Sequence, residues 1–239
     1  MMEQTGVIHS FQSMGAVDGP GLRFVVFMQG CPLRCIYCHN PDTWGIGGEV
    51  YPVSRVVEKI RRFKPYFQHG GGVTVSGGES LSQWEFVAEL FRVLQEEGIH
   101  TALDTSGVGN LKGAEQVLQH TDLVICDMKF STEEAYKKYC KGSLEQVQAF
   151  LQLTQRMEVP LWIRHVVVPG MTDTEENVQQ IVKLAQEYSN LQKIELLPFH
   201  NMCISKYEAL GIEFPLKDCE PCSAATIQHL QQWIPKDLK

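Results

Sequence analysis

The stretch LRFVVFMQGCPLRCIYC, residues 22–38, joins a short apolar run directly to a cluster of cysteines. Residues 22–28 are mostly β-branched, aromatic or aliphatic, which predicts a buried strand. Cys31, Cys35 and Cys38 follow within a few residues, in the spacing C-x3-C-x2-C. A strand whose end carries reactive side chains is the unit that recurs along this chain.

Apolar runs of the same kind predict a series of strands separated by helices. The predicted strands lie at 22–28, 72–76, 99–104, 122–128, 161–168 and 192–197, and the clearest helical patterns lie at 54–63, 82–98, 143–157 and 172–188. Strands joined by helices imply right-handed crossovers and a mainly parallel sheet. We therefore predict an α/β fold, a partial (β/α)6 TIM-like barrel. A doubly wound open sheet is the alternative that periodicity alone does not separate from it.

Length, charge and hydropathy limit the class of protein. At 239 residues and 44% hydrophobic, the chain is long enough for one domain with a substantial core. We expect a single domain over 1–239, with its barrel at about 20–200 and a C-terminal segment, 201–239, packed on it. The formal charge of −7 argues against a nucleic-acid partner. No apolar run approaches the roughly 18 residues of a membrane span and no signal peptide is apparent, so we expect a cytoplasmic protein.

Polar motifs follow the predicted strands, each at the point where its strand ends. They are SGGES (76–80), DTSG (104–107), DMK (127–129), RHVVVPG (164–170) and LLPFH (196–200). In a parallel barrel, all of these strand ends open onto the C-terminal face, where active sites of this architecture are built. The sequence therefore predicts one active site that gathers these motifs and the cysteine cluster.

The cysteine cluster indicates a metal. Without a secretory signal, cysteines remain reduced and available as ligands, and soft thiolates select iron–sulfur clusters, zinc or Cu(I). A structural zinc site needs four ligands, and the nearest fourth candidate, His39, is poorly placed because it directly follows Cys38. A [4Fe–4S] cluster held by three cysteines leaves one iron open to another ligand, which is a catalytic feature.

Six motifs together resemble a known family. They are GAVDGPGLRFVVFMQGCPLRCIYCHNPDTW (15–44), GGGVTVSGGE (70–79), LDTSG (103–107), DLVICDMK (122–129), WIRHVVVPGMTD (162–173) and KIELLPFH (193–200). The three-cysteine motif and the later GGE are similar to the radical S-adenosylmethionine (SAM) superfamily. The full set resembles its glycyl-radical activases, in particular those that act on pyruvate formate-lyase. Activases of other enzymes often insert a ferredoxin-like cluster domain after the first motif, whereas residues 39–71 contain no cysteine.

This resemblance implies a radical SAM oxidoreductase with a [4Fe–4S] cluster and S-adenosyl-L-methionine as cofactors. The reduced cluster cleaves SAM to a 5'-deoxyadenosyl radical, which abstracts a hydrogen from a glycine Cα of pyruvate formate-lyase. It further implies flavodoxin or ferredoxin as electron donor, a monomeric protein, and a place in anaerobic glucose metabolism. The alternatives are an activase of another glycyl-radical enzyme, a small-molecule radical SAM enzyme and, with much less support, a non-enzymatic zinc-binding domain.

Residues in the first two motifs receive roles from the resemblance. Cys31, Cys35 and Cys38 are expected to ligate the cluster, and their loop brings Tyr37 and His39 to the nucleoside of SAM. In the second motif, the missing side chains of Gly77 and Gly78 allow the backbone to approach the methionyl ammonium group, and Glu79 adds a negative charge nearby.

The later motifs supply the rest of the expected site. Asp127, Met128 and Lys129 are expected along the ribose and carboxylate side of SAM, with the Lys129 ammonium as the carboxylate's counter-ion. Arg164 is expected to bind an anionic group of SAM or a backbone carbonyl of the partner enzyme. The His200 ring is expected to lie against the adenine.

Several positions leave alternatives open. Asp104 is either a helix cap or, with Asp127, part of a cation site beside the SAM carboxylate. Cys219 and Cys222 have a C-x2-C spacing. With Cys203 they are either incidental thiols, which we favour, or ligands of a second cluster or zinc. Ser80 stands where many radical SAM proteins have proline, which is expected to affect the stiffness of the loop more than the chemistry.

Overall fold

Most strands of the single sheet in this protein lie beside one another in chain order. The computed structural model describes residues 3–45 and 47–239. Its strands are β1 (Thr5–Gly15), β2 (Arg23–Met28), β3 (Glu49–Pro52), β4 (Gly72–Gly77), β5 (His100–Thr105), β6 (Leu123–Asp127), β7 (Leu161–Val167) and β8 (Leu191–Pro198). They are arranged in the order β3-β1-β2-β4-β5-β6-β7-β8. All pairings from β2 to β8 are parallel.

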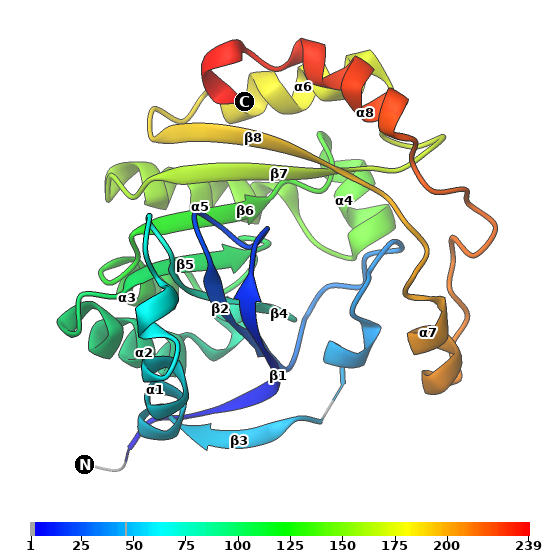
Figure 1. The fold of residues 1–239 in the computed structure, drawn as a ribbon. Coiled ribbons are helices and arrows are strands. Elements are labelled where there is room, and N and C mark those ends of the chain that lie inside the picture. The colour runs from blue at the N-terminus through cyan, green and yellow to red at the C-terminus, as the bar shows by residue number, and fades with distance from the viewer. Residues whose placement is uncertain (1–2, 46) are drawn as a thin grey trace.

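Helices cover the outer side of the curved sheet, apart from α7 (Ile204–Leu210), which lies beyond the end of β8 (Figure 1). They are α1 (Val53–Arg61), α2 (Trp84–Glu96), α3 (Leu111–Leu118), α4 (Glu133–Cys140), α5 (Leu144–Arg156), α6 (Glu175–Ala185), α7 (Ile204–Leu210) and α8 (Ala224–Leu230). Several helices begin at an N-cap residue. The hydroxyls of Ser143 and Thr174 accept hydrogen bonds from the backbone N–H groups of Gln146 and Asn177. Apolar side chains between the helices and the sheet form the main core.

The partial barrel is confirmed, and the doubly wound alternative is wrong. A doubly wound sheet reverses its strand order at a switch point, whereas β2 and β4 to β8 follow one another without reversal. In the described part of the chain, the edge strands of the sheet are β3 and β8, so the barrel remains open between its two ends.

The six predicted strands are present within a residue or two, and two further strands were not predicted. Strand β1 pairs antiparallel with both β2 and β3. Its residues from Phe11 to Met14 are exposed or only half-buried, so that it lacks the continuous apolar run of the central strands. The short β3 is exposed at Glu49 and Val50.

The segment after β8 returns along the outside of the sheet. Helix α8 contacts β8, and the turn that follows it contacts α6 (Figure 1). Among the described residues, no helix combines the length and the apolar character needed to cross a membrane.

Candidate active site

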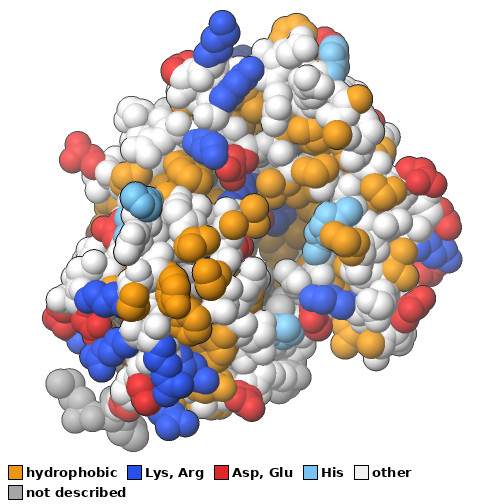
Figure 2. All heavy atoms as spheres, viewed as in Figure 1, with side chains coloured by type: hydrophobic (Ala, Val, Ile, Leu, Met, Phe, Trp, Pro, Cys, Tyr) orange, Lys and Arg blue, Asp and Glu red, His pale blue; other side chains and the backbone are white. Residues whose placement is uncertain are grey.

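One cavity of about 240 Å³ lies at the C-terminal ends of the parallel strands. Figure 2 shows the face on which it opens, hollowed at its centre and bordered by hydrophobic side chains. Its lining combines the cysteine loop with the ends of five strands: Cys31, Leu33, Cys35, Tyr37, Cys38, His39, Asn40, Thr43, Trp44, Ser76, Gly77, Gly78, Asp104, Thr105, Ser106, Asp127, Lys129, Arg164, Val166 and Leu197. The sequence motifs therefore converge on one site.

The three cysteines lie on the loop that follows β2. All three line the cavity, and Cys35 is buried while Cys31 and Cys38 are half-buried. The loop is held at its base by a hydrogen bond from the Gly30 N–H to the Thr43 carbonyl, at 2.8 Å. Inside the loop, the Cys38 N–H donates to the Cys35 carbonyl at 3.1 Å.

The surroundings of these thiols fit a cluster better than a single metal ion. Burial raises the pKa of Cys31 to about 12 and that of Cys38 to about 11, so thiolates require a compensating positive charge here. In the regions 3–45 and 47–239, no group of three His, Cys, Asp or Glu side chains converges on one metal position. A cubane does not require such convergence, because each of its three cysteines binds a different iron.

The two glycines at the end of β4 pack directly against the end of β2 and the start of the cysteine loop. Gly77 has φ +107°, and a β-carbon on it would lie 2.4 Å from the Met28 nitrogen. A β-carbon on Gly78 would lie 2.2 Å from the Gly30 carbonyl oxygen. The space that these residues leave free is therefore occupied by the backbone of the end of β2 and of the cysteine loop that follows it, which joins the two motifs into one unit.

Glu79 does not line the cavity, and its carboxylate points into the protein. It is 1% exposed and accepts hydrogen bonds from the backbone N–H groups of Leu81 and Ser106, at 3.0 and 2.9 Å. It also accepts from the hydroxyls of Thr105 and Ser106. The structure therefore places Glu79 as a brace between the loops after β4 and β5.

Asp127 and Lys129 form an ion pair at the cavity wall. The Lys129 ammonium lies 3.0 Å from the Asp127 carboxylate, and both side chains are mostly buried. Burial by itself lowers the pKa of Lys129, but Asp127 and Cys35 outweigh it and raise the pKa above its ordinary value. Lys129 is therefore a fixed positive charge at the cavity.

Asp104 lies at the same wall, at the end of β5. Its carboxylate accepts a hydrogen bond from the Ser76 hydroxyl at 2.8 Å and lies 3.6 Å from the Arg164 guanidinium. Burial raises the pKa of Asp104 to about 6, against the opposing effect of Arg164, and the neighbouring Asp127 raises it further. Two carboxylates thus face the cavity together, as the cation hypothesis requires.

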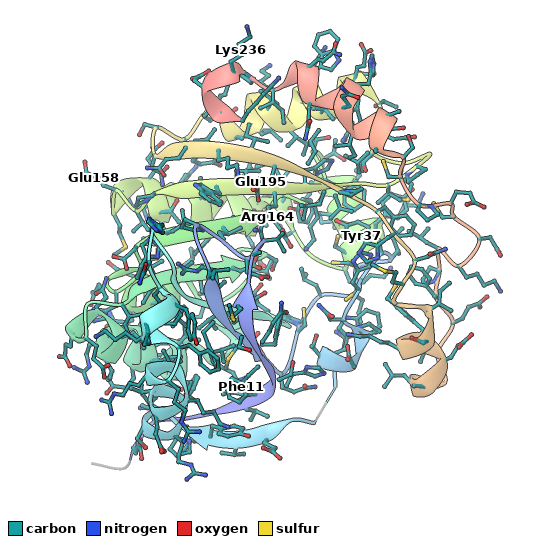
Figure 3. All side chains as sticks on the ribbon, viewed as in Figure 1. Phe11, Tyr37, Glu158, Arg164, Glu195 and Lys236 are labelled. Carbon is teal, nitrogen blue, oxygen red and sulfur yellow. The ribbon has the colours of Figure 1, made fainter. Side chains whose placement is uncertain are left out.

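Arg164 is buried on β7 and has several partners within the protein. Its guanidinium lies 2.8 Å from the Glu195 carboxylate of β8 and donates to the Val17 carbonyl at 2.5 Å. Figure 3 shows Arg164 and Glu195 next to each other, with Tyr37 across the interior from them. Arg164 therefore ties the loop before β2 to the strands that line the cavity, while its side chain forms part of the lining.

The aromatic side chains expected near the nucleoside lie on the cysteine-loop side. The His39 and His200 rings are stacked with centroids 3.9 Å apart, and Nε2 of His39 donates to the His200 carbonyl at 2.8 Å. Burial lowers the pKa of His39 to about 4, so its ring is neutral at pH 7. His39 and Tyr37 line the cavity, whereas His200 lies behind His39 and does not.

Met128 is buried and does not line the cavity. Its backbone carbonyl accepts a hydrogen bond from Nδ1 of His165 at 2.7 Å. His165 is itself 1% exposed, and its other ring nitrogen, Nε2, accepts a hydrogen bond from the Asn177 side-chain amide. Met128 and His165 thus hold the turn that carries Lys129.

Several lining residues were not predicted individually. Thr43 and Trp44 lie at the end of the cysteine motif, and Ser76, Thr105 and Ser106 lie inside motifs already recognised. Val166 and Leu197 reach the cavity from β7 and β8. No sequence signal distinguishes these two from core residues, because apolar residues on a strand are usually packing groups.

The C-terminal cysteines lie away from the cavity. The Cys219 thiol approaches the Pro169 carbonyl at 3.8 Å, and the Cys222 N–H donates to the Phe199 carbonyl at 2.8 Å. Cys203 is buried at the start of α7. Among the described residues, these three thiols do not converge on a metal position.

Comparisons with known proteins identify the family of the chain. The profile of the radical SAM superfamily matches residues 25–185. A pyruvate formate-lyase-activating enzyme of Clostridium pasteurianum is 44% identical over 236 residues, which cover 98% of this chain and 99% of that protein. The chain belongs to this family of activating enzymes. A second member, from Staphylococcus epidermidis, is 40% identical over 238 residues, covering 96% of this chain and 95% of that protein.

Solved structures confirm the radical SAM fold of the family. A radical SAM methyltransferase from Sphaerobacter thermophilus matches with a TM-score of 0.67 at 14% identity, over 91% of this chain and 66% of that one. A domain of a pyruvate-formate lyase-activating enzyme from Bacteroides vulgatus matches with a TM-score of 0.57 at 22% identity, over 69% of this chain and 93% of that one. The profile match and the near-full-length relatives confirm the resemblance inferred from the sequence motifs, and the solved structures agree in fold.

Membership of the activating-enzyme family implies two cofactors, a [4Fe–4S] cluster and S-adenosylmethionine. The cavity fits both. Its cysteine side offers three thiols, and its opposite side offers the paired charges of Asp127 and Lys129.

Proposed function

We propose that this protein activates pyruvate formate-lyase by forming a glycyl radical on it. The observation that carries the proposal is the convergence of the C-x3-C-x2-C loop with the ends of β4 to β7 on one cavity. The near-full-length similarity to proteins named pyruvate formate-lyase-activating enzyme supports the choice of partner. When bound, the cluster and SAM supply the 5'-deoxyadenosyl radical that takes a hydrogen from the glycine Cα.

The protein's own residues bind and orient the reactants. Cys31, Cys35 and Cys38 hold the cluster, while Tyr37 and His39 lie on the nucleoside side. Gly77 and Gly78 present backbone to the methionyl ammonium group. The neutral ring of His39 suits an uncharged nucleoside, since it brings no net charge to that wall.

The wall of the cavity opposite the cysteines binds the charged carboxylate group of SAM. Lys129 serves as counter-ion of the SAM carboxylate, and its pairing with Asp127 keeps the ammonium in place before SAM binds. Met128 acts through its backbone, by fixing the turn between these two residues. Asp104 and Asp127 together suit a cation beside that carboxylate.

The side of Arg164 is where the partner's glycine loop enters. Arg164 holds the Val17 carbonyl, so a backbone carbonyl already occupies one of its donor groups. A backbone carbonyl of the partner's loop is the same kind of acceptor that the Arg164 guanidinium already binds in Val17. Glu79 supports this arrangement indirectly by bracing the loops after β4 and β5.

The proposal also includes the location of the protein, its metabolic role, its oligomeric state and its electron donor. We assign the protein to the cytoplasm and to anaerobic glucose metabolism, as a monomer that receives electrons from flavodoxin or ferredoxin. The proposed partner is itself an enzyme of that metabolism, and the cluster requires a low-potential donor. An open iron is sensitive to oxygen, which restricts activity to anaerobic conditions.

The test is anaerobic activation in vitro. The reconstituted protein is mixed with SAM, dithionite and pyruvate formate-lyase, and the glycyl doublet is followed by electron paramagnetic resonance. Anaerobic ribonucleotide reductase serves as the competing substrate. A doublet on pyruvate formate-lyase alone supports the proposal, whereas a doublet only on the other enzyme would assign a different partner.

A further inference from the structure

The C-terminal end of α4 docks on the outer side of the cysteine loop. The Arg34 N–H donates to the Cys140 carbonyl at 2.8 Å, and the Ile36 N–H donates to the Tyr139 carbonyl at 2.9 Å. These carbonyls belong to the last turn of a helix, where no partner exists within the helix. The two hydrogen bonds lie on either side of Cys35, so the helix end is fixed to the backbone around a proposed cluster ligand.

Side chains at this junction are also tightly packed. Cys35 and Cys140 are both buried. The residues after α4 also pack closely on the cysteine loop, since a β-carbon on Gly142 would lie 2.6 Å from Cδ2 of Leu33. The end of helix α4 therefore covers the backbone around Cys35 on its outer side.

The surface above this contact is basic. Arg34, Lys137, Lys138 and Lys141 are exposed on the cysteine loop and on the end of α4, and we call them the α4 basic face. Lys137 pairs with Glu133 at 3.3 Å. Across residues 3–45 and 47–239, no ion pair neutralises the other three. A concentration of positive charge at this point contrasts with the formal charge of −7 for the whole chain.

Aromatic rings hold two of these cations in place. The Arg34 guanidinium lies 5.1 Å from the centre of the Trp44 ring, and the Lys138 ammonium lies 4.8 Å from that of Tyr139. Arg34 also donates to the Cys31 and Leu33 carbonyls, at 2.8 and 2.7 Å. Because their positions are constrained, these charges lose less side-chain entropy when a partner binds.

We propose that the α4 basic face docks an acidic, low-potential electron-transfer protein and brings its redox centre next to Cys35. This inference rests on the proposed function, since it presumes the cluster at Cys31, Cys35 and Cys38. One electron leaves the reduced flavin or iron–sulfur centre of the donor and reduces the cluster, and no covalent bond forms or breaks. Complementary charge favours fast, reversible encounter, which suits the small interfaces of redox partners.

A double charge reversal tests the docking face without touching the cysteine loop. The variant carries Lys138→Glu and Lys141→Glu. Arg34 is left unchanged, because it donates a hydrogen bond to the Cys31 carbonyl. The matched control is Lys112→Glu with Lys183→Glu, because both lysines are exposed on other helices and the change in net charge is the same. Iron content per chain verifies that all three proteins assemble the cluster.

The readout is the rate of cluster reduction, followed by loss of visible absorbance in a stopped-flow experiment without pyruvate formate-lyase. With reduced flavodoxin at low salt, the α4 variant should react about tenfold more slowly than the wild type and the control. With dithionite, which needs no protein docking, all three should react alike. Added salt should slow the wild type and reduce its advantage over the variant.

Other outcomes overturn the inference. Equal rates with flavodoxin for all three proteins would exclude the α4 basic face as its docking site. If the variant is reduced normally but activates pyruvate formate-lyase poorly with either reductant, the face binds the glycyl-radical enzyme instead. A wild-type protein that is reduced at the normal rate but forms no glycyl radical would contradict the proposed function and leave the docking result intact.

Discussion

Gly78 lies directly against Gly30, so closely that a β-carbon on Gly78 would approach the Gly30 carbonyl oxygen to 2.2 Å. The same two segments are joined by a hydrogen bond from the Glu79 N–H to that carbonyl, at 2.8 Å. The loop proposed to approach SAM and the loop that carries the cysteines therefore form one backbone unit. A change in either is expected to affect both cofactors.

Gly78→Ala should disrupt this unit. Because the clash is with backbone rather than with a flexible side chain, we expect a loss of about 1–3 kcal/mol in the free energy of unfolding. We also expect reduced iron content after reconstitution, since the cysteine loop must shift. Denaturant unfolding and iron analysis measure the two effects. Gly45→Ala is the control, since a β-carbon there meets no atom of the described residues within 4 Å, apart from its chain neighbours. Equal iron binding by both variants would contradict the coupling.

Removal of single cysteines should divide them into two groups. Alanine at Cys31, Cys35 or Cys38 should abolish the cluster, because a cubane held by three ligands loses one of its anchors. Alanine at Cys219 or Cys222 should leave about four irons per chain. Iron analysis and visible absorbance on anaerobically reconstituted protein check both outcomes. A wild type with about eight irons that falls to four in the Cys219 variant would show that the C-terminal cysteines hold a second cluster.

The strand ends could be predicted because their determinants are local. An apolar run of β-branched residues followed by a polar motif predicts both a strand and its direction, and the parallel barrel then places the motif on a known face. Asp104, Asp127 and Lys129 reached the cavity for this reason. The cysteine loop followed in the same way from its spacing and from the strand before it.

Tertiary contacts explain the rest of what was missed. The sequence shows that Glu79 follows two glycines but not that its carboxylate turns inward to the residues after β5. The hydrogen bond from the Arg34 N–H to the Cys140 carbonyl joins positions far apart in the chain and has no periodic signature. The hairpin of β1 escaped prediction because its tip is exposed and its alternation is weak.

Glu79→Gln should destabilise the loops after β4 and β5. The carboxylate accepts from two backbone N–H groups and two hydroxyls, and an amide provides only one accepting oxygen. Buried donors left without a partner cost about 1–3 kcal/mol in unfolding free energy. Thermal unfolding of the cluster-free protein measures this cost. Should Glu79 instead act mainly on the methionyl ammonium group, the variant would unfold like the wild type and lose only SAM affinity.

Lys129→Met should weaken SAM binding while keeping most of the packing of the side chain. A hydrogen bond to a charged group contributes about 1.5–3 kcal/mol, which corresponds to a rise of about 10- to 100-fold in the Kd for SAM. Equilibrium dialysis with the oxidised cluster gives this Kd without turnover. Lys112→Met, on the surface of α3, is the control. An unchanged Kd in the Lys129 variant would remove Lys129 from the proposed carboxylate site.

Asp104→Asn should change stability in a pH-dependent way. The pKa of Asp104 in the folded protein is about 6, above its ordinary value of 3.8, so its ionisation disfavours the folded state. The unfavourable contribution is absent below about pH 4, grows as pH rises to 6 and is complete at pH 7. The cluster-free variant should therefore be more stable than the wild type at pH 7, by about 1–3 kcal/mol, and this difference should shrink towards pH 4.

The same variant tests the cation hypothesis for Asp104 and Asp127. If the two carboxylates hold a cation beside the SAM carboxylate, asparagine should raise the Kd for SAM at pH 7 even though the cluster-free protein is more stable. Opposite changes in stability and affinity are not expected from a helix cap, whose loss lowers stability. Asp104→Asn with unchanged SAM affinity and normal turnover would leave the raised pKa as a consequence of burial alone and exclude the cation.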